Sequence, residues 1–293
     1  MSFNGRQRRT TQKIIGALPM LLCAIVDVIA QPVRAATDAS GDSSQHRRPR
    51  LGIYAGIVFD MHANAGLVTE SQHGIKTIDI AGLGYRAGVQ TAFELGELWD
   101  VLPHLGFASW SAAGSLADVP ARARVRRLDG SSADTIVPVD VGVSIVYRMI
   151  EVGMLFEHLV RSSDTASTLS LGVGPAVSVI IGSRQTEAFE MGNGEGITFA
   201  EQEGRQLENN GTRIVYWNDE INRRAFVRMS ALAAVSVTRQ LNDRASLRGS
   251  LAFNIPLTSV VELTSWRAFG TSVSIGMQWR LLEAEVPTPT IDQ

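Results

Sequence analysis

Cysteine is almost absent from this chain of 293 residues. The single one, Cys23, lies in an apolar N-terminal stretch that we expect to be removed, so the mature chain is predicted to have neither a disulfide nor thiol chemistry. Leu22 stands directly before it, where a lipoprotein signal has a small residue, and this argues against lipid attachment.

Long apolar runs are missing beyond residue 30, and none approaches the roughly 18 residues of a membrane helix. The earlier run, residues 14–30, follows four basic residues, is interrupted by Pro19 and Asp27, and precedes small residues at 33–35. A retained membrane anchor is the alternative, but a central aspartate would cost about 2.5 to 3.5 kcal/mol. We therefore interpret residues 1–35 as a cleaved secretory signal peptide.

An excess of positive charge is missing as well. Removal of residues 1–35 takes away five of the 27 basic residues and one of the 29 acidic residues, so the mature chain keeps 22 basic against 28 acidic residues. This balance gives no indication of a nucleic-acid partner.

The sequence does contain a two-residue period, most clearly in the eleven residues 271–281. Small or polar residues separate the apolar ones, which are Val273, Ile275, Met277, Trp279 and Leu281. A β-strand with this pattern has one apolar and one polar face, which by itself fits any two-faced sheet. Its length exceeds that of a typical globular strand and matches the about 9 to 11 residues that a tilted membrane strand needs.

Seven earlier segments repeat the period, at 51–61, 83–95, 101–111, 137–149, 169–181, 225–237 and 247–257. The predicted fold is all-β, an eight-stranded antiparallel up-and-down transmembrane β-barrel over residues 51–281. The barrel must be closed, because an open sheet edge in lipid leaves backbone groups unpaired. A soluble sandwich is the alternative, but it would have shorter strands. Residues 36–50 are predicted to be an unstructured lead-in, and residues 282–293 a short periplasmic tail.

The connections between these segments alternate in length. Those at 64–81, 112–134 and 183–222 are long, whereas those at 96–100, 238–245 and 259–266 are shorter. Barrels of this kind have long extracellular loops and short periplasmic turns, so three long extracellular loops and two periplasmic termini are expected. Residues 150–167 are too long for a periplasmic turn. They form either a short amphipathic turn or an extension of the flanking strands.

Aromatic residues, though only 6% of the chain, fall near the ends of the predicted strands. Phe59, Tyr85 and Phe269 are expected to face outwards at the extracellular ends, and Phe93, Tyr147 and Trp279 at the periplasmic ends. Such placement is typical of two aromatic girdles that flank an apolar band.

The closing segment carries the most specific resemblance. Ser274, Gly276, Trp279 and Leu281 have the spacing at which a polar residue, a glycine and two apolar or aromatic residues recur in the last strand of bacterial outer-membrane barrels. From residue 51 to 281 the chain resembles the small eight-stranded barrels of the OmpA/OmpX type. The resemblance implies insertion in a Gram-negative outer membrane, contact with its lipid and lipopolysaccharide, and recognition of the closing strand by the barrel-assembly machinery. The low aromatic content and the twelve residues after Leu281 depart from the pattern.

The polar faces of the strands predict a charged lumen. Its members are expected to be Asp60, Arg86, Glu94, Asp140, Arg148, Arg228, Arg248 and Arg280. Eight strands enclose room for side chains rather than a water-filled pore, so we expect a paired network that plugs the barrel, which suits a structural or surface-interaction protein. A narrow ion or solute pore is the alternative. A lipid-modifying enzyme is a second alternative, for which His62, His73 and His104 are available without a recognisable catalytic constellation.

Basic residues also cluster in one predicted loop, at Arg122, Arg124, Arg126 and Arg127. They are candidates for contact with lipopolysaccharide phosphates, with an acidic partner in the loop at 184–222, or with solvent alone. We find no motif for a cofactor or a metal ion, and the sequence does not identify a surface ligand.

The predicted faces of the closing strand can be tested by substitution. A charged residue in place of Ile275, such as Ile275→Arg, should destabilise the barrel by about 2 to 4 kcal/mol near the bilayer midplane, whereas Ser274→Asn should be tolerated. Urea unfolding in lipid vesicles measures both variants. Equal sensitivity at the two positions would show that the faces are assigned wrongly.

Overall fold

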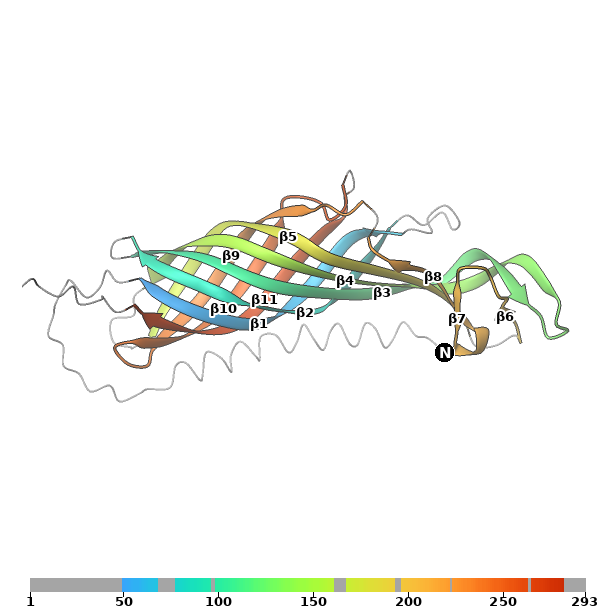
Figure 1. Ribbon diagram of the computed structural model, residues 1–293, viewed down its shortest axis with the longest axis horizontal. Coiled ribbons are helices and arrows are strands. Elements are labelled where there is room, and N and C mark those ends of the chain that lie inside the picture. The colour runs from blue at the N-terminus through green and yellow to red at the C-terminus, as the bar shows by residue number, and fades with distance from the viewer. Residues whose placement is uncertain are drawn as a thin grey trace, which may run out of the picture.

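The computed structural model describes residues 49–67, 77–95, 98–160, 167–192, 196–221, 223–262 and 265–281. The predicted signal peptide and tail, and most of the predicted lead-in, lie outside these ranges. Almost all of the described chain is antiparallel strand (Figure 1). Within it, no helix is long and apolar enough to cross a membrane.

Eight strands form a closed ring. In chain order they are β1 (Arg50–Gly66), β2 (Thr77–Glu94), β3 (Trp99–Arg126), β4 (Ser132–Val160), β5 (Ser167–Met191), β9 (Val227–Gln240), β10 (Ala245–Pro256) and β11 (Arg267–Arg280). Each strand pairs with its neighbours in this order, and β1 closes the ring against β11, with Leu51 opposite Trp279. The predicted eight-stranded antiparallel barrel is confirmed, and it is the architecture that the resemblance implied.

The outer surface of the ring is apolar. Along β1, Leu51, Ile53, Ile57 and Met61 are exposed, whereas Tyr54, Val58, Asp60 and His62 between them are buried inside. The remaining strands alternate in the same way over their part of the ring, and their exposed residues include Val89, Leu105, Val173, Met229 and Ile275. This matches the two faces that the periodicity predicts.

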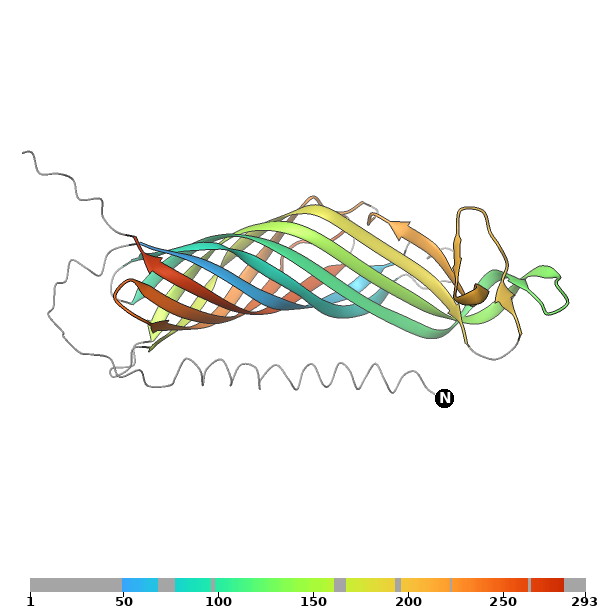
Figure 2. The same ribbon diagram turned by 60° about the horizontal axis from the view of Figure 1, so that its bottom comes forward.

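Strands β3 and β4 run far beyond the ring. They have 28 and 29 residues, and their paired ends project past the barrel at the end opposite Pro49 and Leu281 (Figures 1 and 2). We call this projection the arm; it consists of residues 116–142, 187–192 and 196–217. The part of β3 from Leu116 to Arg126 spans roughly 35 Å at about 3.3 Å per residue.

The lengths of the strands correct two predicted connections and decide between the alternatives for a third. Residues 112–134 are mostly strand with a tight turn at 127–131, and residues 183–191 continue β5. Residues 150–160 also belong to β4, so the strand-extension alternative for the 150–167 segment is the right one there. The alternation of apolar and polar residues has the same period inside and outside a barrel, and for this reason the pattern does not show where the ring ends.

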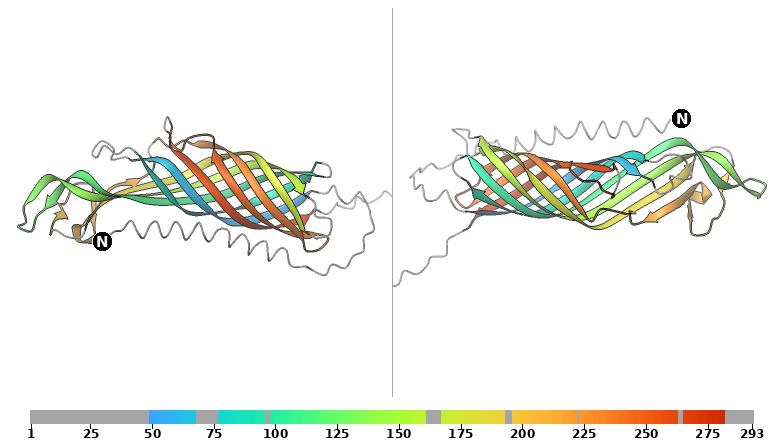
Figure 3. Two further views of the ribbon diagram at one scale, coloured as in Figure 1. Left: turned by 180° about the vertical axis from the view of Figure 1, so that it is seen from behind. Right: turned by 90° about the horizontal axis from the view of Figure 1, so that it is seen from above.

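The arm has its own apolar core. Short segments fold over its sheet: β6 (Thr198–Phe199) pairs with β3, and β7 (Gln206–Glu208) and η2 (Asn209–Gly211) lead to β8 (Arg213–Asp219), which pairs with β5 (Figure 3). Val125, Val139, Phe189, Phe199 and Ile214 are buried together between them. Tyr216 packs on Phe189 at a ring distance of 4.1 Å and stacks against Arg205. Burial raises the pKa of Tyr216 against the opposing pull of Arg205, so the phenol is neutral at pH 7.

Along strand β4 the apolar residues change from the inner face of the strand to its outer face. From Val137 to Met149 the odd-numbered residues are buried and apolar, and the even-numbered Ser144 and Arg148 are exposed. From Ile150 to Phe156 the exposed residues are apolar, and the buried ones include Glu151 and Glu157. The exchange occurs at the same level on β3, since the apolar pair Phe107 and Ile150 is followed by the polar pair Ser109 and Arg148.

The mouth of the ring on the arm side is covered. Two connections cross it and bind each other, with Ala225 N donating to Val260 O and Glu262 N donating to Arg223 O. Val260 and Trp266 from one connection and Ile221 from the other are buried against Trp110 and Tyr147 of the barrel wall. This layer forms an apolar cap over the lumen.

Candidate functional site

The lumen holds three layers of polar side chains below the apolar cap. Strand β4 contributes one residue to each layer, namely Tyr147, Glu151 and Glu157. All three side chains are buried, and each contacts residues from other strands of the ring. From the arm side towards the chain termini, the three layers are the upper, the middle and the lower layer.

The upper layer is centred on His62, which has no exposed surface. Its Nδ1 lies 3.0 Å from the Tyr147 hydroxyl and 3.2 Å from the Trp266 indole nitrogen, and its Nε2 lies 3.0 Å from Asp60 Oδ2. Because the indole can only donate, Nδ1 is the acceptor and Nε2 carries the proton that it donates to Asp60. Arg228 lies over the Trp110 ring at 5.0 Å.

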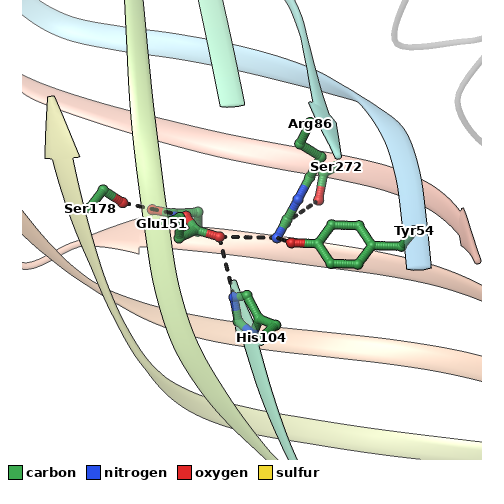
Figure 4. A network of polar contacts seen from close by, with 7 residues as sticks. Tyr54, Arg86, His104, Glu151, Ser178 and Ser272 are labelled. Carbon is green, nitrogen blue, oxygen red and sulfur yellow. Dashed lines mark hydrogen bonds and ion pairs between the residues drawn. The ribbon is translucent and has the colours of Figure 1, made fainter. Parts of the chain in front are cut away.

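The middle layer is centred on Glu151 (Figure 4). Arg86 donates to Glu151 Oε1 at 3.0 Å, and His104 Nε2 lies 3.4 Å from the same oxygen. Arg86 also contacts Ser272 at 3.2 Å and the Tyr54 hydroxyl at 3.4 Å. Ser178 on β5 and Asn254 on β10 lie 3.5 and 3.4 Å from the other oxygen of Glu151, so six strands contribute side chains to one network around a single carboxylate.

Glycines make room for these long side chains. A Cβ atom at Gly88 would lie 2.7 Å from the Tyr54 hydroxyl, and one at Gly153 would lie 2.7 Å from His104 Nε2. Real Cβ atoms do not approach so closely, so both positions need glycine for the network to form.

The lower layer contains two carboxylates that lie directly opposite each other, Asp100 on β3 and Glu157 on β4. Each has its own arginine: Arg50 binds Asp100 at 2.5 Å, and Arg248 forms a short ion pair with Glu157. Two serine hydroxyls, of Ser170 and Ser236, also point to Glu157. The pairing lowers the cost of burying like charges side by side.

The structure places the predicted lumenal residues as follows. Asp60, Arg86, Arg228 and Arg248 lie in the lumen, and Glu94 and Arg280 lie half-buried at the termini end of their strands. Asp140 and Arg148 were predicted on the wrong face. Arg148 is exposed, and Asp140 accepts a hydrogen bond from Asp118 N in the arm. Their segment lies where the apolar face of β4 points inwards, which also buries Tyr147 instead of placing it in a girdle.

The sequence reasoning missed Arg50 and Asp100 of the lower layer, and it also missed Glu151 and Glu157. A signal was present, because they alternate with Ile150, Val152, Met154 and Phe156 as in any other strand of the ring. The segment was interpreted as a connection, so the alternation was not used there.

The remaining candidates are also placed. Arg122, Arg124 and Arg126 are exposed on one face of β3 in the arm, and Arg127 is exposed at the turn. In the closing strand, Ser274 and Gly276 are partly buried, whereas Trp279 and Leu281 are exposed. His62 and His104 are buried in the lumen, and His73 lies outside the described residues. Among the residues that are described, no group of three or more His, Cys, Asp and Glu side chains is placed to hold a metal ion.

Comparison with known proteins gives only distant likeness. No protein-family model and no curated protein matches the chain. Among solved structures, the outer-membrane protein OprG from Pseudomonas aeruginosa is 9% identical, with a TM-score of 0.40 and coverage of 81% of this chain and 98% of that one. Neisserial surface protein A is 6% identical, with a TM-score of 0.35 and coverage of 79% and 97%. At such scores the likeness carries no argument about function.

The middle layer can be tested by a double-mutant cycle. Glu151→Gln leaves the Arg86 charge buried without its partner, so it should destabilise the barrel by about 3 to 5 kcal/mol. The double variant Glu151→Leu with Arg86→Leu should lose less than the two single changes added together. Urea unfolding of the refolded protein, followed by tryptophan fluorescence, measures each variant.

Arg148→Gln is the matched control. Its side chain is on the exposed face of the same strand, so the expected change is within about 0.5 kcal/mol. If Glu151→Gln cost no more than Arg148→Gln, the ionic network would not stabilise the lumen.

Proposed function

We propose that this chain is a bacterial outer-membrane barrel with a closed lumen, that both termini lie in the periplasm, and that the arm is displayed outside the cell as an interaction surface. The observation that carries the proposal is the exchange of polar and apolar faces at one level of β3 and β4. On the termini side of this level, the outward residues of both strands are apolar and suit lipid. On the arm side, the outward residues are polar and suit water.

The apolar band supports insertion in a bilayer. Large apolar side chains are exposed on every strand of the ring, with Ile53 at 54% and Val173 at 63% of their possible surface. Soluble monomers rarely expose continuous apolar surface of more than a few hundred Å². A closed ring also meets the requirement that no strand edge face lipid. The exposed Trp279 and Leu281 at the closing edge are consistent with recognition of β11 by the assembly machinery.

The packed lumen supports a role other than transport. Three polar layers and the apolar cap occupy successive levels of the lumen. The lumenal cavity at Arg86, Trp110 and Asn254 has a volume of about 10 Å³, enough for about one water molecule. Of the three described histidines, His62 and His104 are buried and lie within hydrogen-bonding distance of lumenal carboxylates, and His158 is half-buried beside Trp99, which does not favour a catalytic role at the surface.

The structure of the arm supports its proposed role as an interaction surface outside the cell. Its own core holds it as a paired sheet, so it presents its surface without first having to be ordered by a partner. Arg122, Arg124 and Arg126 are exposed at every second position of β3, about 6.6 Å apart along the strand. Guanidinium groups bind phosphate in a bidentate manner, so lipopolysaccharide phosphates are a fitting partner for this row.

Surface labelling tests the orientation. The mature chain has no cysteine, so a single Leu128→Cys variant reports on the turn at the arm tip, where Leu128 is 88% exposed. A maleimide that does not cross membranes should label this variant in intact cells.

Asn242→Cys is the matched control, because Asn242 is exposed in the β9–β10 turn at the opposite end of the barrel. It should be labelled only after the outer membrane is permeabilised. The reverse pattern would invert the proposed orientation, and equal labelling of both variants before permeabilisation would contradict insertion.

Conductance tests the closed lumen. The refolded protein in a planar bilayer should show no stable current steps, since the packed layers leave no continuous water path. Insertion is verified by protection of the barrel from protease in the same lipid. Stable steps in the nanosiemens range would overturn the closed lumen and favour the pore.

A further inference from the structure

Three arginines converge at the mouth of the barrel on the side of the chain termini. Arg50 and Arg280 lie directly opposite each other in the β1–β11 ladder, and Arg280 N donates to the backbone oxygen of Arg244 at 2.9 Å. Like charges in opposite positions of an antiparallel pair destabilise the sheet. The arrangement therefore needs a compensating negative charge.

The protein supplies only part of this compensation. Arg50 is paired with Asp100, but the side chains of Arg244 and Arg280 form no ion pair with any residue that the structure describes. Asp243 is the one carboxylate among the residues that line the pocket at this mouth. A positive charge remains that no described side chain neutralises.

The pocket between these arginines has a volume of about 80 Å³. Gln278 lines it with 2% of its surface exposed, and its Nε2 has no hydrogen-bond partner among the described residues. Arg50 Nε is buried nearby and is likewise unpartnered. Both atoms are donors, and a buried donor without an acceptor costs about 1 to 3 kcal/mol. The site has donors in surplus and lacks an acceptor.

We propose that this pocket binds a phosphate group. A phosphate has several acceptor oxygens, which suits donors that come from different strands, and guanidinium groups match it in geometry and charge. By the measure on which a cavity of about 10 to 15 Å³ holds one water molecule, the pocket has room for several, which is enough for one such group. The hydroxyls of Thr168, Thr238 and Ser246 also line the pocket and add neutral hydrogen-bonding groups.

The phosphate comes from one of two sources, the free ion or a phospholipid headgroup. Trp279 and Leu281, on either side of Arg280, are exposed on the apolar outer surface, so a lipid at this rim would place its headgroup near the pocket. The lipid source rests on the membrane insertion proposed above. Binding of the free ion does not.

Calorimetric titration of the refolded mature chain in a phosphate-free detergent tests the proposal. The two probes are inorganic phosphate and a short-chain phosphatidylglycerol. Arg244→Gln and Arg280→Gln should each weaken binding about tenfold or more, as expected for the loss of one charge-assisted hydrogen bond. Arg122→Gln, at an exposed arginine in the arm, is the matched control and should bind like the parent chain.

Either probe supports the site if its binding depends on Arg244 and Arg280. Binding of phosphate identifies the free ion as sufficient, and binding of the lipid alone identifies the headgroup. Arg244 is exposed in a turn, so its variant keeps the fold and decides the result even if Arg280→Gln fails to refold. Binding of neither probe, or equal binding by Arg244→Gln and Arg122→Gln, overturns the proposal, whatever orientation the cysteine labels report.

Discussion

The structure depends on one constraint: each strand has two faces, and the apolar one must turn away from water. Strand β4 meets this constraint in two parts, whose apolar faces point in opposite directions. In the arm and under the cap its apolar face points inwards. In the rest of the ring its apolar face points outwards, and the exchange lies between Arg148 and Ile150. Strand β3 changes at the same level, through Phe107 and Ser109. A soluble barrel has no reason for such a reversal, whereas a chain that passes from water into lipid requires it.

The reversal makes the lumen polar within the ring, and this determines how the lumen is built. Carboxylates such as Glu151 and Glu157 are buried there, so each needs a positive or hydrogen-bonding partner from another strand. Glycine in the facing wall leaves room for side chains that reach across, as at Gly88 beneath Tyr54. The ion pairs and the glycines of the lumen are therefore consequences of the same constraint.

Much of the fold could be predicted from the sequence, because the two-residue period identifies strands whatever their surroundings. All eight strands of the ring contain a predicted segment, and Asp60, Arg86, Arg228 and Arg248 lie in the lumen. The period does not say which face meets which medium. The prediction took every apolar face as the outer one, which fails for Tyr147 and Arg148. It also does not separate a long strand from a strand and a loop, and for that reason Glu151, the centre of the middle layer, was missed.

The arm has free strand edges. Strands that extend beyond a closed ring have unpaired backbone groups, which are open to pairing with other chains. Pro120 and Pro138 lie directly opposite each other in the arm, Pro138 next to the last residue of β4 that pairs with β5, and Pro120 seven residues beyond the last residue of β3 that pairs with β2. Neither proline has an N–H, so the two residues cannot form a hydrogen-bonded pair with each other. They form the other kind of antiparallel pair, in which the backbone groups point to the outer edges. The hydrogen bond from Ala200 N to Arg124 O, four residues further on, shows the same alternation. Each free edge therefore lacks a donor at this pair, and β6 covers β3 beyond it. The arm can extend into water as a sheet because its edges are blocked or covered at these points.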